Sequence, residues 1–412
     1  MAQAQLDEEV VYYYYLYYTV VLATILVVVA RFLVVKLRRR NSGENPPPGP
    51  WQLPVIGSLH HLFGALPHHA MRDLARQHGP LMLLRLGELR LVVASSATAA
   101  REVMKTHDAA FAKRPRTTTN TVKRIRGGMG IAMAPHGEHW QQVRKLCVNE
   151  LLSARQVRSF HATREAEAGR LVASVALASL SQSQPVNLGS HLATYLHDVV
   201  VRAIVGDRIT DREAFLACLE DSMTAAAGLS LADLFPSSRL ARAFCGRTRL
   251  LEAAYQPMTH VLDGVIKEHG NGDDDLLGVL LRMQTEGAPL HLGTIRALIT
   301  DLFGAGIETT TTTLQWAMAE LMRNPNVLRR AQAEVRAALA GQSRVWEKDL
   351  PGLRYIQLVI KETLRLHIAG PLLLPRECRE SCRVLGYDVP KGAMVLVNAW
   401  AIAGHPNLGP RR

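Results

Sequence analysis

The protein has 412 residues, of which 48% are hydrophobic and 20% are charged. This balance is typical of a folded globular chain and excludes a disordered or fibrous protein. The 48 basic and 36 acidic residues give a formal charge of +12, but the basic residues are dispersed over many predicted helices and form no stripe with aromatic side chains. Nucleic-acid binding therefore has little support.

An uncharged apolar run of 21 residues, Val10 to Ala30, lies near the amino terminus. It is just long enough for a helix to cross a bilayer core of about 30 Å. Acidic residues precede the run and basic residues follow it, which predicts a single span at 10–35 with the bulk of the chain on the cytoplasmic side. A cleaved signal peptide is the alternative, but its usual basic region is missing. We therefore predict an uncleaved transmembrane signal anchor.

A basic, proline-rich hinge follows at 36–57. Its centre, Pro46-Pro47-Pro48-Gly49-Pro50, cannot be helical and is stiff. The remaining residues, 58–412, contain no second run of comparable length and apolarity, which argues against a multi-span transporter. We expect residues 58–412 to form one large domain, which the stiff hinge holds in a fixed position relative to the membrane.

The body of the chain is predicted to be mainly helical. Leu66 to His78 has the pattern of a short amphipathic helix, and Leu81 to Ser95 that of a hairpin around Gly87-Glu88. In most of the chain after Ser95, residues recur at helical spacing. Strand-like runs return at Arg383 to Val389 and Met394 to Val397. The predicted fold class is mainly α with a small β portion.

The longest predicted helix, Leu292 to Arg323, has a weakened middle. Gly304 and Gly306 each cost about 1 kcal/mol relative to alanine, and a run of threonines follows at 309–313. Threonine hydroxyls can also bond back to the preceding turn. An acid, Glu308, lies at this turn. The weakened turn would let a flat cofactor and a diatomic ligand press against the backbone. A glycine-flexed core helix is the alternative interpretation.

Two further pairs of side chains could carry function. Glu362 and Arg365 share one helical face, and Trp140 and Arg144 lie one turn apart as a plausible clamp for two carboxylates. Taken alone, each is also compatible with an ordinary surface pair.

Cysteines and histidines give no metal-binding pattern. The five cysteines are too few and too scattered for a disulfide framework, and the histidine pairs at 60–61 and 68–69 lack the spacing of a ligand set. The cysteines are Cys147, Cys218, Cys245, Cys378 and Cys382. We interpret the histidine pairs as exposed loop residues and the cysteines as consistent with a reducing compartment.

Several motifs in fixed order resemble those of microsomal cytochrome P450 monooxygenases, and this set of motifs is most like that of plant class II enzymes. The likeness runs from about Pro46 to Gly404. The motifs are the Pro46–Trp51 hinge with Pro54–Gly57, Phe111–Pro115, Ala134–Glu138, Trp140-x-x-x-Arg144-Lys145, Ala305–Thr310, Lys361–His367 and Leu374–Cys378. Ala305–Thr310 is similar to the family's oxygen-binding helix and Lys361–His367 to its Glu-x-x-Arg helix.

The resemblance implies roles for the weakened turn of the long helix. Glu308 and Thr309 would relay protons to iron-bound dioxygen, with Thr309 hydrogen-bonding the distal oxygen. Ala305 and Gly306 would leave room for the haem and O2.

It also implies how the haem is held. Trp140, Arg144 and Arg376 would bind the haem propionates, since arginine suits a carboxylate. Glu362 and Arg365 would be a structural ion pair. Residues 117–133 and parts of 222–235 and 370–374 would line the substrate pocket.

The implied cofactor is haem (iron protoporphyrin IX), with NADPH acting only through a partner NADPH-cytochrome reductase. The implied substrate is a small apolar specialised metabolite. The implied location is the endoplasmic reticulum membrane, as a single-pass protein whose catalytic body faces the cytosol and binds no nucleic acid.

One departure from the family pattern concerns the metal ligand. The family holds haem iron through a cysteine thiolate in a Phe-x-x-Gly-x-Arg-x-Cys loop, and none of the five cysteines lies in that context. The sequence is therefore interpreted as a P450 fold truncated before this loop, with no metal ligand of its own, with haem weakly held or absent, and with impaired catalysis. The alternative is a non-catalytic, membrane-anchored interaction protein or truncated gene product that still binds the reductase.

Overall fold

The computed structural model describes residues 18–19, 45–119, 121–122, 128–181, 185–207, 209, 212–270, 274–339, 342, 344 and 346–404. Apart from Tyr18 and Thr19, the predicted anchor at 10–30 lies outside these residues. The chain divides into two compact units: Met1–Phe111 with Cys378–Leu396, and Ala112–Glu377 with Val397–Arg412. The division into anchor, hinge and one large domain stays a prediction.

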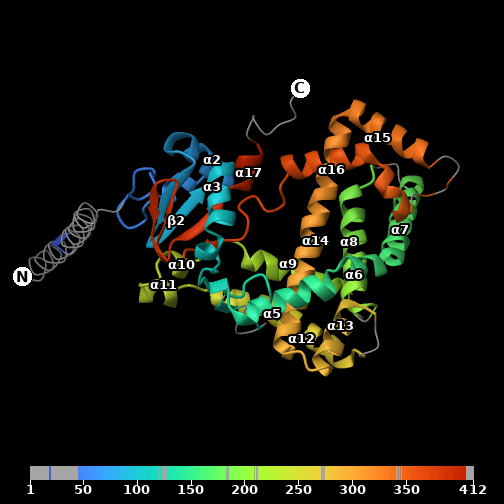
Figure 1. The fold of residues 1–412 in the computed structure, drawn as a ribbon, viewed down its shortest axis with the longest axis horizontal. Coiled ribbons are helices and arrows are strands. Elements are labelled where there is room, and N and C mark those ends of the chain that lie inside the picture. The colour runs from blue at the N-terminus through green and yellow to red at the C-terminus, as the bar shows by residue number, and fades with distance from the viewer. Residues whose placement is uncertain are drawn as a thin grey trace, which may run out of the picture. The chain divides into compact units, whose positions relative to one another are not determined.

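The first unit combines short helices with strands (Figure 1). Its elements are η1 (Leu59–Leu62), α2 (Pro67–His78), β1 (Leu81–Leu86), β2 (Leu89–Ala94), α3 (Ala97–Arg101), η2 (Glu102–Thr106), η3 (Asp108–Phe111), β4 (Cys382–Val384), β5 (Tyr387–Val389) and β6 (Met394–Val397). β1, β2 and β6 are neighbours in that order, and β4 pairs with β5.

The predicted hairpin at 81–95 is confirmed. β1 and β2 are antiparallel, with Leu81 opposite Ala94 and Leu86 opposite Leu89, and most of their side chains are buried. The run 383–389 differs from the single strand that its pattern suggests. It turns back on itself at Leu385 and Gly386, which have φ of 50° and 84°, because two successive left-handed residues build a tight hairpin turn.

The second unit is almost entirely helical. Its elements are α5 (Glu138–Leu146), η4 (Cys147–Leu151), α6 (Ala154–Ser159), α7 (His161–Ser181), α8 (Leu188–Val205), α9 (Arg212–Ala226), α10 (Leu231–Leu234), α11 (Arg239–Ala243), α12 (Arg247–Glu268), α13 (Leu276–Thr285), α14 (Leu292–Arg323), α15 (Pro325–Ala338), η5 (Glu347–Gly352), α16 (Arg354–Leu366), the two-residue β3 (Arg376–Glu377) and α17 (Ala399–Ala403). The described residues are thus mainly helical with small sheets, as predicted.

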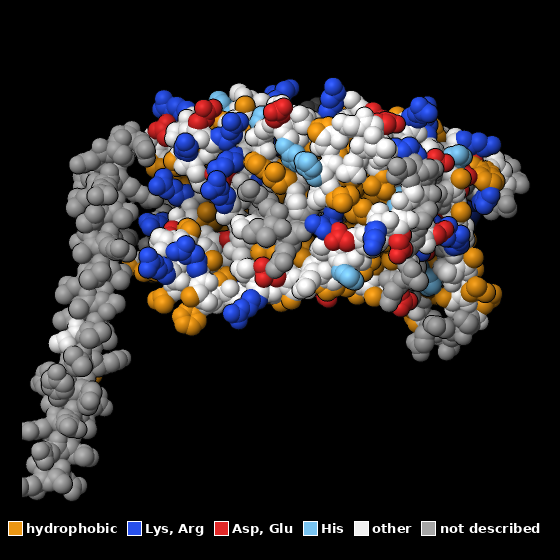
Figure 2. Space-filling view, turned by 90° about the horizontal axis from the view of Figure 1, so that it is seen from below, with side chains coloured by type: hydrophobic (Ala, Val, Ile, Leu, Met, Phe, Trp, Pro, Cys, Tyr) orange, Lys and Arg blue, Asp and Glu red, His pale blue; other side chains and the backbone are white. Residues whose placement is uncertain are grey.

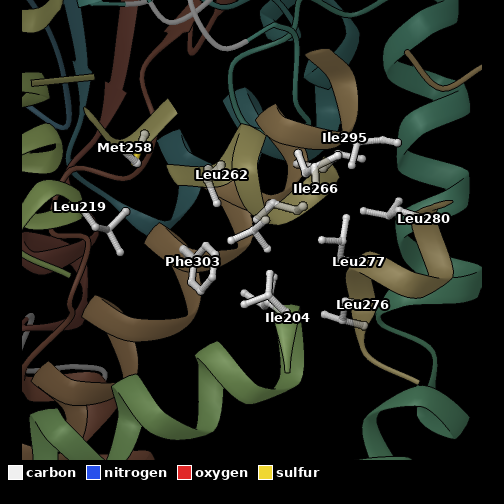
Figure 3. Close-up of a cluster of buried hydrophobic side chains, with 14 of the residues drawn as sticks. Ile204, Leu219, Met258, Leu262, Ile266, Leu276, Leu277, Leu280, Ile295 and Phe303 are labelled. Atoms are coloured by element: carbon white, nitrogen blue, oxygen red, sulfur yellow. The ribbon is translucent and has the colours of Figure 1, made fainter. Parts of the chain in front are cut away.

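The core of this unit surrounds the amino-terminal half of α14. Side chains from α8, α9, α12, α13 and α14 converge there, including Ile204, Leu219, Met258, Leu277 and Phe303 (Figure 3). The Phe303 ring is fully buried and meets the Phe215 ring edge-on at 5.0 Å. Such burial and aromatic contact stabilise a helix that its own glycines and threonines disfavour. α14 has the bounds that the sequence predicts.

One described stretch, Arg212–Leu234, is long enough to cross a membrane and has a mean hydropathy of 1.2. It is not one straight helix, because α9 ends before Gly228, which has a φ of 78°, and α10 begins after the Ser230 cap. Phe215 and Leu219 of α9 are buried in the core around α14. These features are those of a core helix followed by a turn.

Candidate functional site

The weakened turn of α14 stays helical because threonine hydroxyls bond back to it. Thr309 Oγ1 donates to the carbonyl oxygen of Ala305 at 2.7 Å, and Thr313 Oγ1 donates to that of Thr309 at 2.8 Å. Ala305, Glu308 and Thr309 are all exposed. Ala305 and Thr309 lie four residues apart and therefore share one face of the helix. That face presents a small side chain and a hydroxyl.

Gly306 faces the neighbouring helix. A Cβ at this position would lie 3.4 Å from both methyl groups of Val200 on α8. Glycine here therefore lets α8 approach α14 closely (Figure 1). Its part in leaving room for haem stays a prediction.

Glu308 lines a cavity of about 880 Å³ bounded by α8, α9 and α14. The charged and titratable groups around it include His197 of α8 and Glu220 of α9. Glu308 therefore shares this cavity with polar groups from two other helices, and apolar side chains such as Leu216 and Met223 line it as well.

Trp140 and Arg144 of α5 lie together, as their spacing predicts. The Arg144 guanidinium lies 5.2 Å from the centre of the Trp140 ring, and its side chain is exposed. The Trp140 indole N–H donates to the carbonyl oxygen of Ile131 at 3.1 Å. Trp140 thus positions the loop that precedes α5, and its contact with a propionate stays a prediction.

Arg376, on β3, has a second guanidinium close by. Arg114 donates through Nε to the carbonyl oxygen of Ala132 at 3.0 Å and through Nη1 to that of Pro375 at 3.1 Å. Burial, and the positive charge of Arg376, hold the pKa of Arg114 below its usual range. The sequence places this arginine within a family motif but predicts no role for it. Its place between Phe111 and Pro115, both buried, was the available signal.

The loop before α5 rests directly on α14. The Ala132 N–H donates to Asp301 Oδ2 at 2.9 Å, and a Cβ on Gly130 would lie 2.3 Å from the same oxygen. A Cβ on Gly128 would lie 2.2 Å from the carbonyl oxygen of Gly293. Asp301 is a second residue that sequence reasoning missed, although an acid one turn before Ala305 was a visible signal.

Two of the segments predicted to line the substrate pocket are joined through Asp233. Its Oδ1 accepts from the Thr118 N–H at 2.6 Å and from the Thr118 hydroxyl at 2.9 Å, while Oδ2 accepts from the Ser230 N–H at 2.7 Å. Residues 120 and 123–127 lie outside the described residues. In the third predicted segment, 370–374, Leu373 and Leu374 are exposed.

Glu362 and Arg365 form the predicted pair on α16. Arg365 donates through Nε and Nη2 to the two carboxylate oxygens at 2.8 and 2.7 Å, and through Nη1 to the carbonyl oxygen of Ala403 at 2.6 Å. The hydrogen bond from Arg365 holds the pKa of Glu362 below its usual value. Arg365 therefore connects α16 with α17. At the end of α16, the His367 ring stacks on that of Trp316 at 3.8 Å.

The cysteines are the residues that could bind a haem iron through a thiolate. Cys147 and Cys378 are buried, and burial raises their thiol pKa to about 11 and about 12, so both are neutral thiols at pH 7. Within the described parts of the chain, no group of three His, Cys, Asp or Glu side chains could hold a metal ion. Two cations that lie close together, Arg114 and Arg376, suit the carboxylates of haem, and their part in binding it stays a prediction.

The family model for cytochrome P450 matches residues 46–408. This chain belongs to the cytochrome P450 family. It is 44% identical over 375 residues to desmethyl-deoxy-podophyllotoxin synthase of Sinopodophyllum hexandrum, covering 87% of this chain and 73% of the relative. It is 45% identical to zealexin A1 synthase of Zea mays, covering 88% and 74%, and 42% identical to premnaspirodiene oxygenase of Hyoscyamus muticus, covering 87% and 74%.

The fold is that of a solved P450 as well. A zebrafish cytochrome P450 structure with progesterone aligns with a TM-score of 0.70 at 24% identity, covering 84% of this chain and 82% of that one. The resemblance found in the sequence is therefore confirmed for family and fold. By family the protein is an oxidoreductase of the haem-dependent monooxygenases, and its relatives are plant enzymes of specialised metabolism. Plant P450s of this type generally work with redox partners and small substrates and are typically membrane-anchored.

Proposed function

We propose that this P450 oxidises a small apolar specialised metabolite, by hydroxylation or a related monooxygenation, with O2 and electrons from an NADPH-cytochrome reductase. The observation that carries the proposal is the exposed face of α14, where Ala305 and the Thr309 hydroxyl lie one turn apart beside Glu308. The names of relatives that act as oxygenases and synthases in plants support the substrate class.

When bound, haem supplies the activation of O2. On this chain, the Thr309 hydroxyl would hold a proton at the exposed face of α14, and the Glu308 carboxylate, one residue earlier, would replace it from solvent. The small Ala305 side chain leaves space above that face. Glu308→Gln and Thr309→Ala are expected to impair an active P450 and to leave the binding of a reductase intact.

Trp140, Arg144 and Arg376 would bind the haem propionates. Arg114 is a further candidate, because its guanidinium lies close enough to Arg376 to feel its charge. The positive charge of Arg376 acts on Arg114, and a propionate beside them would favour both charged guanidinium groups. Arg376→Ala is expected to weaken haem binding, which a titration of the chain with haem, followed by absorbance, would measure.

We further propose a single-pass anchor in the endoplasmic reticulum membrane with the catalytic body facing the cytosol. The apolar run at 10–30 and its flanking charges support this orientation. The full chain should co-sediment with microsomes and its body should be digested by externally added protease. Deletion of residues 1–44 should shift the chain towards the supernatant.

We propose that the 412-residue polypeptide, expressed by itself, is catalytically impaired and holds haem weakly. None of the five cysteines lies in the haem-ligand motif of the family. The carbon-monoxide difference spectrum of the reduced, haem-supplemented chain tests this. A thiolate-type Soret band would contradict impairment, and its absence would support it.

A non-catalytic role in binding the reductase is the second candidate, favoured by the formal charge of +12. On the face shown in Figure 2, Lys and Arg side chains occur throughout and are interleaved with acidic and hydrophobic ones. Capture of the reductase by the 412-residue chain, lost at high salt, would support this role.

A further inference from the structure

Two of the five cysteines lie in contact with each other. Cys378 directly follows β3 and Cys382 opens β4, and their side chains are hydrogen-bonded to one another. The chain between them bends at Arg379 and Glu380, which brings together two thiols that are four residues apart. Two thiols in contact are the starting arrangement for a disulfide.

The strand opposite β4 holds both cysteines from the same side. Cys382 pairs with Val389 across the β4–β5 ladder, and Cys378 Sγ lies 3.8 Å from the carbonyl oxygen of the same Val389. The Cys378 N–H donates to the carbonyl oxygen of Ala393 at 2.9 Å, and its own carbonyl accepts from the Gly392 N–H at 2.8 Å. Backbone pairing therefore fixes both sulfur atoms beside one strand, independently of the hydrogen bond between them.

The two thiols differ in their access to solvent. Cys378 is completely buried, whereas Cys382 is half-buried. A reagent in solution therefore reaches Cys382 first. Burial raises the pKa of Cys378 to about 12 and the pKa of Cys382 above its ordinary value, so the reduced pair gains no stability as thiolates. This slows oxidation of the pair but favours the disulfide at equilibrium.

We propose that Cys378 and Cys382 form a reversible thiol–disulfide site that is oxidised by a low-molecular-weight disulfide of the glutathione type. The modification needs neither haem nor O2, so it goes beyond the proposed oxidation of an apolar metabolite. Arg376, which is predicted to bind a propionate, lies two residues before Cys378. Oxidation would therefore cross-link the chain directly after the strand that carries Arg376.

The oxidation takes place in two thiol–disulfide exchanges. The Cys382 sulfur loses its proton and attacks one sulfur of glutathione disulfide, whose S–S bond breaks, and the first glutathione leaves as a thiolate that takes up a proton. The Cys378 sulfur then loses its proton and attacks the Cys382 sulfur, and the second glutathione leaves in the same way. Two protein thiols are oxidised and one glutathione disulfide is reduced to two thiols, so electrons and protons balance.

The test is equilibration of the full 412-residue chain at pH 8 in buffers with an increasing ratio of oxidised to reduced glutathione. Free thiols are then blocked with N-ethylmaleimide in denaturant, and the tryptic peptides are analysed by mass spectrometry. Trypsin cleaves after Arg379, between the two cysteines, so the disulfide appears as two linked peptides. In the folded chain these should appear at a ratio at least about tenfold lower than in the unfolded chain, because the fold holds the sulfur atoms together.

Single substitutions separate the two steps. Cys378→Ala should leave Cys382 bound to glutathione, because no second thiol displaces it. Cys382→Ala should leave the buried Cys378 unmodified in the folded chain. Cys245→Ala is the matched control, since Cys245 is also partly exposed but lies between α11 and α12, and the linked peptides should form as in the parent chain.

Two results would overturn the proposal. One is a lasting glutathione adduct on Cys382 of the parent chain without linked peptides, since Cys378 would then be unable to reach it. The other is formation of the linked peptides at the same ratio in the folded and the unfolded chain, since the fold would then contribute nothing. Both comparisons use the parent chain, so they decide the matter even where a variant fails to fold.

Discussion

At the scale of single residues, burial and hydrogen bonding set the chemistry of otherwise identical side chains. Burial raises the thiol pKa of Cys378 to about 12. Desolvation also opposes ionisation of Cys245, but hydrogen bonds from the Ala232 and Arg247 backbone and from Ser230 hold its pKa below the usual value. A thiol and a potential thiolate therefore coexist in one chain.

The first prediction concerns alkylation of these cysteines. At pH 8 a thiol with a pKa near 12 is ionised in roughly one molecule in ten thousand, and only the thiolate reacts. Iodoacetamide should therefore modify Cys245 of the folded chain at least tenfold faster than Cys147 or Cys378, as measured by peptide mass spectrometry. In denaturant the three rates should converge, and a persistent difference there would contradict burial as the cause.

The second prediction concerns Arg365, whose guanidinium bonds Glu362 with two nitrogens and the Ala403 carbonyl with a third. A lysine cannot make these three bonds in a fixed plane. Arg365→Lys should lower the free energy of unfolding by about 1 kcal/mol. Arg323→Lys is the matched control, because Arg323 pairs with Glu320 at the same spacing but is 72% exposed, and its melting temperature should be unchanged.

The Glu362–Arg365 pair also predicts a pH dependence. The pKa of Glu362 is lowered in the folded state, so its stabilisation is complete above the ordinary value of 4.5 and is lost as the pH falls through the lowered value. In urea denaturation between pH 6 and pH 3, Glu362→Gln should lose less stability on acidification than the parent chain. An equal loss in both would show that other carboxylates account for it.

At the scale of elements, glycines and one aspartate dock the loop at 128–134 onto α14. Gly128 has a φ of 84° and approaches the carbonyl oxygen of Gly293, while Asp301 holds the Ala132 N–H. Such contacts fix a loop that its own sequence would leave free. The same loop carries the Ile131 carbonyl that accepts from Trp140, so α5, the loop and α14 are linked in series.

A comparison of alanine substitutions at Gly128 and Gly287 distinguishes the cost of steric contact from the cost of backbone strain. In Gly128→Ala the new methyl group would meet the Gly293 carbonyl, whereas Gly287 has a φ of 92° and no atom within 4 Å of the position that a Cβ would take. Gly287→Ala should cost about 1–2 kcal/mol from the left-handed backbone alone. Gly128→Ala should cost about 1–3 kcal/mol more, measured by urea denaturation. Equal losses would mean that the loop shifts freely.

At the scale of the whole molecule, stability depends on the core around α14. Phe303 is completely buried against Phe215, whereas Phe244 is 80% exposed. Phe303→Ala should cost about 3–5 kcal/mol, a large part of the ~5–15 kcal/mol that stabilises an ordinary domain. The variant should accumulate in the insoluble fraction, while Phe244→Ala should stay as soluble as the parent chain.

Much of this P450 could be predicted from local patterns. The bounds of α14, the hairpin at 81–95 and the Glu362–Arg365 pair all depend on residues close in sequence, where periodicity and turn chemistry decide. The run 383–389 was harder, since only two left-handed residues distinguish its hairpin from one strand.

The sequence by itself determined the family, because motifs of fixed order and spacing can be recognised without any knowledge of packing. Only the tertiary structure decided which side chains share a site. Arg114 donates to the Pro375 carbonyl oxygen, the Asp301 carboxylate accepts from the Ala132 N–H, and Thr118 donates to Asp233, each across more than a hundred residues of chain. Such pairings depend on how helices pack, and the close approach at Gly306 is a property of two helices together that neither sequence segment encodes alone.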